Sequence, residues 1–270
     1  MTRGKRRAAD VAYVLPRHPS EIDRLDIQHY VVQAVRGANY LAPVGRPARI
    51  LEVGSGTGQW ARETCVEFPD AVVVGLDLLP GKPDPPSNYR FVRGNVLQGL
   101  PFADASFDFV HQRLLISGVP VRCWQDLVAE LVRVAGPGGW IELDEAAPGV
   151  EPAGPATQRL HDMLRRLGRE VGLDTTGIVA GSLDRYLTQA GAVDVETWRG
   201  TFPVGEWAGD VGSFLASDLR ALFMRLSDVF QDRFGVPAIE SLELIRAMQE
   251  EFEQQRGSIG SAVAFGRKPG

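Results

Sequence analysis

The chain has 270 residues, of which 44% are hydrophobic and 23% charged, and its formal net charge is −5. This is the ordinary composition of a globular protein that builds its core without disulfides or metals. The negative charge argues against a nucleic-acid partner, and no apolar run reaches the roughly 20 residues of a membrane span, so we expect a cytoplasmic protein.

Residues 1–44 are predicted to form a tail and a helical leader. The first seven residues are basic and lack the apolar stretch of a signal peptide, which favours a solvated tail over a nucleic-acid arm. From Ser20, a candidate N-cap, apolar residues recur at helical spacing until about Gly37. His29 in this helix either closes over a ligand or packs its own helix.

From residue 45 onward, short apolar runs alternate with helical patterns. Strands are expected at 48–53, 71–76, 90–93, 107–111 and 138–143, with helices at 59–68 and 124–135. Apolar strands separated by helices predict a parallel sheet covered on both faces. The expected fold class is therefore a doubly wound α/β fold, which binds its ligand beyond the carboxyl ends of the strands.

After Pro148 the pattern is mostly helical. Helices are expected at 155–171, 182–190, 210–234 and 238–255, and two more strands at 193–198 and 262–265. We expect the helices of 210–255 to be inserted between the last two strands of one sheet, as a lid over its edge. Aromatic residues in and beside this lid either suit a hydrophobic small-molecule acceptor or simply pack the lid onto the sheet.

These patterns divide the chain into four parts: a tail and leader (1–44), a core (45–200), a helical lid and acceptor insertion (201–257) and a final strand that completes the sheet (258–270).

A glycine-rich turn, Gly54-Ser55-Gly56-Thr57-Gly58, follows the first strand. Gln59 stands where a dinucleotide fingerprint needs its third glycine. Glu52, at the end of the strand, repels a pyrophosphate but suits a ligand with an ammonium and a sulfonium group. Unlike charges about 4 Å apart gain several kcal/mol at an intermediate dielectric, so the turn favours S-adenosylmethionine (SAM) over NAD.

Polar residues also follow the next three strands. Asp77 ends the second strand, where its two oxygens can accept hydrogen bonds from both hydroxyls of a ribose. Gly94-Asn95-Val96 follows the third strand and places an amide beside an adenine edge. His111-Gln112-Arg113 follows the fourth strand, beneath the reacting sulfonium.

Over about residues 45–145 the chain resembles the class I SAM-dependent methyltransferases. The resemblance is carried by Ile50 to Gly58, Gly75-Leu76-Asp77, Phe91 to Val96, Leu100-Pro101-Phe102 with Ser106 to Val110, and Arg133-Val134 with Pro137-Gly138-Gly139. The leader segments Leu15-Pro16, Glu21, Arg24-Leu25 and Gln28-His29 resemble those of a subfamily from natural-product pathways, related to fungal regulators of secondary metabolism. The resemblance implies a Rossmann-like, mostly parallel sheet of seven strands with an antiparallel last strand.

The resemblance also implies roles for individual residues. Glu52 and the turn through Gly54, Ser55, Gly56 and Gly58 would hold the methionine part of SAM. Asp77 would bind the ribose, Leu78 would pack on the adenine, and Asn95 and Val96 would bind it. Asn95 departs from the Asp common in the family, so we expect retained binding of altered strength. Trp60 either covers the methionine end or packs the first core helix.

Methyl transfer from a sulfonium mainly requires alignment of the reactants, and a base helps when the acceptor is a hydroxyl. His111 is the leading candidate base, although a purely structural role is somewhat favoured for it. Asp144 and Glu145, beyond the fifth strand, are alternatives that could also grip an amine, unless they are solvated loop carboxylates. His161 either reaches the site from above or, as the favoured reading, lies at the surface.

The predicted function is methyl transfer from SAM to a small-molecule acceptor, a secondary metabolite, at O, N or C. The alternatives are methylation of a quinone precursor, or a SAM-binding regulator or scaffold that transfers no methyl group. No zinc-ligand set occurs, so no metal is expected. A homodimer through the helical lid is left open.

Overall fold

The computed structural model describes residues 19–270, with side chains from Arg24 onward. The basic segment 1–7, the Leu15-Pro16 pair and the Ser20 cap predicted from the sequence lie outside the described side chains. Seven strands form one sheet in the order β3-β2-β1-β4-β5-β7-β6. They are β1 (Arg49–Val53), β2 (Val72–Asp77), β3 (Tyr89–Arg93), β4 (Phe107–Arg113), β5 (Ala135–Ala146), β6 (Val193–Pro203) and β7 (Ser258–Arg267).

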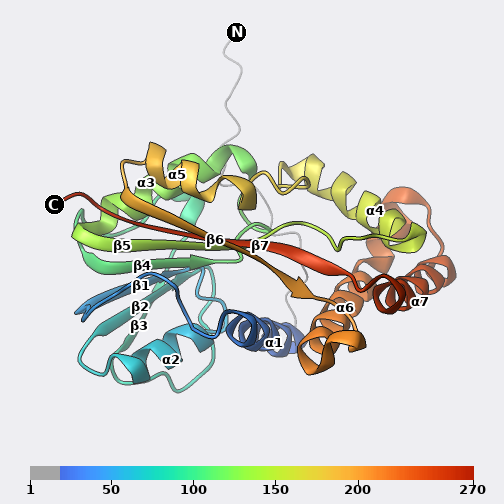
Figure 1. The fold of residues 1–270 in the computed structure, drawn as a ribbon, viewed down its shortest axis with the longest axis horizontal. Helices are drawn as coiled ribbons and strands as arrows, with labels where there is room; N and C mark the ends of the chain where they lie inside the picture. The colour runs from blue at the N-terminus through green and yellow to red at the C-terminus, as the bar shows by residue number, and fades with distance from the viewer. Residues whose placement is uncertain (1–18) are drawn as a thin grey trace, which may run out of the picture.

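The last strand runs against its neighbours. β1 to β5 pair in parallel, whereas β7 is antiparallel to both β5 and β6. Helices α1 (Pro19–Arg36) and α2 (Gln59–Glu67) lie on one face of the sheet, and α3 (Trp124–Val134) and α5 (Leu183–Gln189) on the other (Figure 1). The predicted doubly wound, seven-stranded fold with an antiparallel last strand is therefore confirmed.

Three further helices lie together beyond one end of the strands, on the right in Figure 1. They are α4 (Pro155–Val171), α6 (Gly209–Phe234) and α7 (Ala238–Gln255). Both α6 and α7 fall between β6 and β7 in the chain, so they are the expected helical insertion. α4 begins with Pro155 at its first position and ends where Gly172 adopts a left-handed φ of 76°, which are ordinary start and stop signals.

The longer strands differ most from the prediction. β5, β6 and β7 extend beyond their apolar runs because their antiparallel pairing is long. β5 pairs with β7 from Trp140↔Arg267 to Ala146↔Ser261. β6 pairs with β7 as far as Pro203↔Ser258. Backbone hydrogen bonds in such a ladder need no apolar side chains, so the sequence pattern understates its length. β6 consequently crosses the predicted core boundary at residue 200. The division into four parts stays a prediction.

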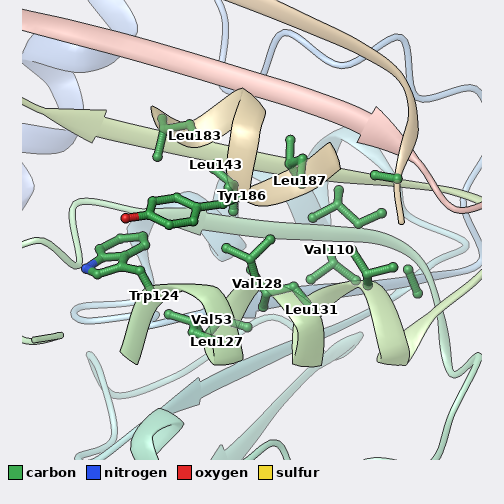
Figure 2. Packing of buried hydrophobic residues seen from close by; sticks show 14 of the residues in the cluster. Val53, Val110, Trp124, Leu127, Val128, Leu131, Leu143, Leu183, Tyr186 and Leu187 are labelled. Carbon is green, nitrogen blue, oxygen red and sulfur yellow. The ribbon is translucent and has the colours of Figure 1, made fainter. Parts of the chain in front are cut away.

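One buried cluster fills the space between the sheet and the α3–α5 face. Figure 2 shows side chains of three strands meeting those of both helices: Val53, Val110, Leu143, Leu127, Val128, Leu131, Leu183 and Leu187. Each fully buried side chain of this kind contributes roughly 1.5–3 kcal/mol. This cluster packs the parallel strands against α3 and α5.

A second cluster joins α1, α4, α6 and α7. Its buried members include Val31 and Val32 of α1, Leu160 and Leu167 of α4, and Phe223 of α6.

None of the helices between residues 19 and 270 is long and apolar enough to cross a membrane.

Candidate functional site

A cavity of about 960 Å³ lies at the carboxyl ends of the parallel strands. This is where a doubly wound fold places its ligand, and the volume is at the upper end of the roughly 300–1,000 Å³ of small-molecule sites. The turns after β1 to β5 form its floor, and α1, α4 and α6 contribute to its walls. It brings together eleven of the predicted cofactor residues: Glu52, Gly54, Ser55, Gly56, Trp60, Asp77, Leu78, Gly94, Asn95, Val96 and Arg113.

At the glycine turn, the backbone packs so closely against neighbouring residues that a side chain at Gly54, or at the facing Gly81, would clash. Gly54 has a φ of +75°, and a Cβ on it would lie 2.4 Å from Cδ2 of Leu115. A Cβ on Gly81 would lie 2.4 Å from the Thr57 carbonyl oxygen. Gly58, with a φ of 76°, precedes the first residue of α2 and does not reach the cavity wall. The glycines of this turn therefore offer backbone rather than side chains to a ligand.

Glu52 supplies a buried carboxylate at this turn. Its side chain lines the cavity and is 6% exposed, and Oε2 has no hydrogen-bond partner among the described residues. Burial raises the pKa of Glu52 to about 8, against the opposing positive charge of Arg113. A buried ionised carboxylate needs a cation or hydrogen-bond donors beside it. The site thus favours a ligand that brings a positive charge.

Asp77 is held by the same turn. Oδ2 accepts a hydrogen bond from the Gly56 N–H at 2.9 Å, and Oδ1 accepts one from the Leu78 N–H at 2.6 Å. A carboxylate oxygen can accept more than one hydrogen bond, so both oxygens keep capacity for a ligand. Asn95 instead uses its side-chain oxygen to cap the Leu97 N–H at 3.0 Å.

Helix α1 is fastened over the glycine turn. Asp26 accepts a hydrogen bond from Thr57 Oγ1 at 2.8 Å and forms an ion pair with Lys82. His29 lies farther along the helix, with Nδ1 2.8 Å from Arg113 Nη2 and Nε2 3.0 Å from Glu63 Oε1. Because an arginine only donates, His29 Nδ1 accepts and its ring proton faces Glu63. Burial, reinforced by Arg113, lowers the pKa of His29.

His111, the leading candidate for a base, does not line the cavity. Its side chain is fully buried, and its ring stacks on that of Trp60 with 4.0 Å between centroids and 2° between planes. Burial and the nearby Arg113 lower the pKa of His111 well below its usual value. Strand alternation points its side chain toward α2, where it packs as a neutral core residue. Trp60 itself packs in this core and reaches the cavity edge.

The predicted alternatives Asp144 and Glu145 are also absent from the wall, and neither is a solvated loop residue. Asp144 is 4% exposed and forms an ion pair with Arg36 at 2.5 Å. Glu145 is fully buried and accepts hydrogen bonds from Gln112 Nε2 and, at 2.6 Å, the Leu115 N–H. Gln112, predicted to contact the cofactor, is engaged there instead. These three side chains fix α1 and the loop after β4.

The comparisons with known proteins agree with this geometry. The profile of the family described as "Methyltransferase domain" matches residues 50–139. Methyltransferase str2 of Strobilurus tenacellus is 35% identical over 174 residues, which is 61% of this chain and 62% of that protein. N-methyltransferase sirN of Leptosphaeria maculans is 28% identical over 272 residues, 95% of each chain.

A solved structure shares the fold. Phosphoethanolamine N-methyltransferase 2 of Haemonchus contortus, in complex with phosphomonomethylethanolamine and S-adenosylhomocysteine, has a TM-score of 0.51 and 15% identity over 92% of this chain and 53% of that one. Residues 50–139 thus match the methyltransferase-domain model, and the chain is similar to these methyltransferases. It spans 62% of the length of str2 and 50% of a second methyltransferase of the same fungus, str3.

On the side of the cavity away from the glycine turn, the wall includes His161 and residues of α6 that the sequence analysis did not single out. His161 was expected at the surface, but it is 4% exposed and lines the cavity. The α6 residues Leu215, Leu219 and Leu222 also line it. Their helical spacing was the available signal, but periodicity does not show what a helix faces.

A group of three polar side chains, Arg24, Gln28 and Asp218, lies among these apolar walls. Asp218 of α6 accepts a hydrogen bond from Gln28 Nε2 at 2.9 Å and lies 3.4 Å from Arg24 Nη1. Arg24 and Gln28 belong to α1, and all three residues line the cavity. The group therefore joins the leader helix to the insertion across the cavity.

Proposed function

We propose that the protein is a SAM-dependent methyltransferase that methylates a small-molecule acceptor, a secondary metabolite, at O, N or C. The observation that carries the proposal is the buried, unpartnered Oε2 of Glu52 beside a glycine-rich turn. This carboxylate lies within the segment, residues 50–139, that matches the methyltransferase-domain model. A dinucleotide would bring a pyrophosphate to this carboxylate, whereas SAM brings an ammonium and a sulfonium group.

The residues on the cavity wall have the chemical character that the parts of SAM require. Glu52 would hold the ammonium group, Asp77 the ribose hydroxyls, and Leu78, Asn95 and Val96 the adenine. Bound SAM supplies an electrophilic methyl group on a sulfonium. The chain's own contribution is to align the acceptor with that group and to exclude water, which can supply a large part of the rate enhancement.

The acceptor would occupy the part of the cavity between α1, α4 and α6. Its walls carry many apolar side chains, among them Val31, Leu164, Leu167, Leu219 and Leu222. Such walls suit a small hydrophobic molecule. Cytoplasmic location, absence of a nucleic-acid partner and a homodimer stay predictions from the sequence.

Calorimetric titration with SAM and, separately, with NAD tests the proposal. We expect micromolar SAM binding that weakens about tenfold or more in Asp77→Ala, which is about 1.4 kcal/mol. Asp70→Ala is the matched control, because Asp70 is an exposed carboxylate in the loop before β2. Absence of SAM binding, or preference for NAD, would refute the proposal.

Incubation with SAM and a panel of acceptors then separates the remaining alternatives. Methylated product from hydrophobic secondary metabolites supports the proposed activity, and product confined to quinone precursors supports that narrower class. SAM binding with no product from any acceptor would favour a regulator or scaffold.

A further inference from the structure

His161 carries a buried, unpaired hydrogen-bonding atom beside the acceptor side of the cavity. The residue lies on α4, lines the cavity and is 4% exposed, and its Nδ1 is buried with no hydrogen-bond partner in the described part of the chain. Nε2 accepts a hydrogen bond from the Val150 N–H at 3.5 Å. A neutral imidazole has one accepting and one donating nitrogen, so the ring proton is on Nδ1.

A glycine lies against the Nδ1 edge of the ring, where a side chain would crowd it. A Cβ on Gly149 would lie 3.2 Å from both Nδ1 and Cε1 of His161, and Gly149 adopts a φ of +114° that side chains disfavour. Gly149 also lines the cavity. Burial and, to a lesser extent, the positive charge of Arg165 lower the pKa of His161 to about 4. The ring is therefore neutral near pH 7.

The surroundings of His161 are apolar. It packs near the ring of Phe223, with 6.3 Å between centroids. Leu164 and Leu167 of the same helix and Leu222 of α6 line the cavity with it. A buried donor left without a partner costs roughly 1–3 kcal/mol. A ligand oxygen at this position would remove that cost.

We propose that His161 binds the acceptor by donating a hydrogen bond from Nδ1, and that the acceptor is an apolar small molecule carrying an oxygen atom at that point. This rests on the proposed methyltransferase function, because it assigns the α4–α6 side of the cavity to the acceptor. His161 here binds and orients the acceptor and takes no proton from it.

Two probes of the same apolar body test this without knowledge of the natural acceptor. 2-Naphthol has one hydroxyl oxygen and naphthalene has none. Each is titrated by tryptophan fluorescence into protein saturated with S-adenosylhomocysteine, and again into the protein alone. S-adenosylhomocysteine binding is measured first by calorimetry, so failure of the proposed cofactor site is seen separately.

Two substitutions separate the two ring nitrogens. His161→Asn keeps a polar amide near the Nδ1 position, whereas His161→Gln reaches the Nε2 position and can still pair the Val150 N–H. We expect 2-naphthol to bind the wild type and His161→Asn within about threefold of each other, and to bind His161→Gln about tenfold more weakly. Naphthalene should bind all three proteins equally.

Three results would overturn the proposal. One is that neither probe binds the loaded wild type, and another is that His161→Gln binds 2-naphthol as well as His161→Asn does. The third is that His161→Gln weakens naphthalene as much as 2-naphthol, which would indicate a general packing defect. Unchanged S-adenosylhomocysteine affinity in both variants shows that each is folded.

Discussion

Glu52 is the residue on which the electrostatics of the site depend. Its pKa, raised to about 8 by burial, leaves the carboxyl mostly protonated near pH 7 in the ligand-free protein. An ammonium group placed beside the unpartnered Oε2 favours the ionised form. Binding of SAM is therefore expected to expel a proton from Glu52.

This coupling predicts a pH dependence with a definite sign. As pH rises from 6 toward 8, SAM affinity of the wild type should increase by up to about tenfold per pH unit, since less work is needed to ionise Glu52. Calorimetry in buffers of different ionisation enthalpy should detect close to one released proton at pH 7. The ligand's own α-amino group, with a pKa of about 8, contributes equally to any variant.

Glu52→Gln provides the comparison. It should bind SAM about tenfold more weakly at pH 8 and release no proton from this position. If proton release persists in Glu52→Gln, the proton comes from elsewhere and the assigned role of Glu52 is wrong.

At the scale of elements, α1 acts as a cover attached to the sheet by a buried ion pair. Arg36 and Asp144 have side chains that are 2% and 5% exposed and lie 2.5 Å apart. Arg36 also donates to Ser261 Oγ at 2.6 Å and lies over the ring of Trp198, 4.3 Å from its centroid. One side chain of α1 thus contacts β5, β6 and β7.

Removing one partner of this pair leaves an uncompensated buried charge. Arg36→Met should lower the free energy of unfolding by about 3–5 kcal/mol. Replacing both partners, in Arg36→Met/Asp144→Asn, should restore part of that loss, because the charge left behind in the single variant is removed. Urea denaturation followed by circular dichroism measures both.

The control is Arg246→Met, which breaks an exposed pair with Glu250 whose side chains are 85% and 61% exposed. It should change the free energy of unfolding by less than about 1 kcal/mol. Equal effects of Arg36→Met and Arg246→Met would show that α1 is not anchored by Arg36.

The elements themselves were largely predictable, because periodicity and glycine or proline signals are local. The helices at 155–171 and 238–255 have the bounds expected from the sequence, and Glu52 and Asp77 stand at strand ends as the pattern indicates. The environment of His111 was not predictable, because it depends on Trp60 stacking from another element. The environment of Asp144 was not predictable for the same reason, since its partner Arg36 lies far back in the chain.

At the scale of the whole molecule, the cavity is lined by parts of the chain that lie far apart in the sequence. Its walls come from the leader helix, the strand ends, α4 and the insertion between β6 and β7. The cluster that joins α1, α4, α6 and α7 also includes Phe202 of β6 and Ile259 of β7, so the insertion shares its apolar contacts with the sheet. A ligand in this cavity should therefore stabilise the core and the insertion together.

Differential scanning calorimetry tests that coupling. S-adenosylhomocysteine at about 100 times its Kd adds about 2.7 kcal/mol of stability, which corresponds to a rise in Tm of roughly 5–10 °C for a chain of this size. We expect a single transition that moves as a whole, a smaller rise in Glu52→Gln, and none with NAD. Two transitions, with only one of them shifted, would contradict the coupling, because the insertion would then unfold independently of the cavity that it encloses.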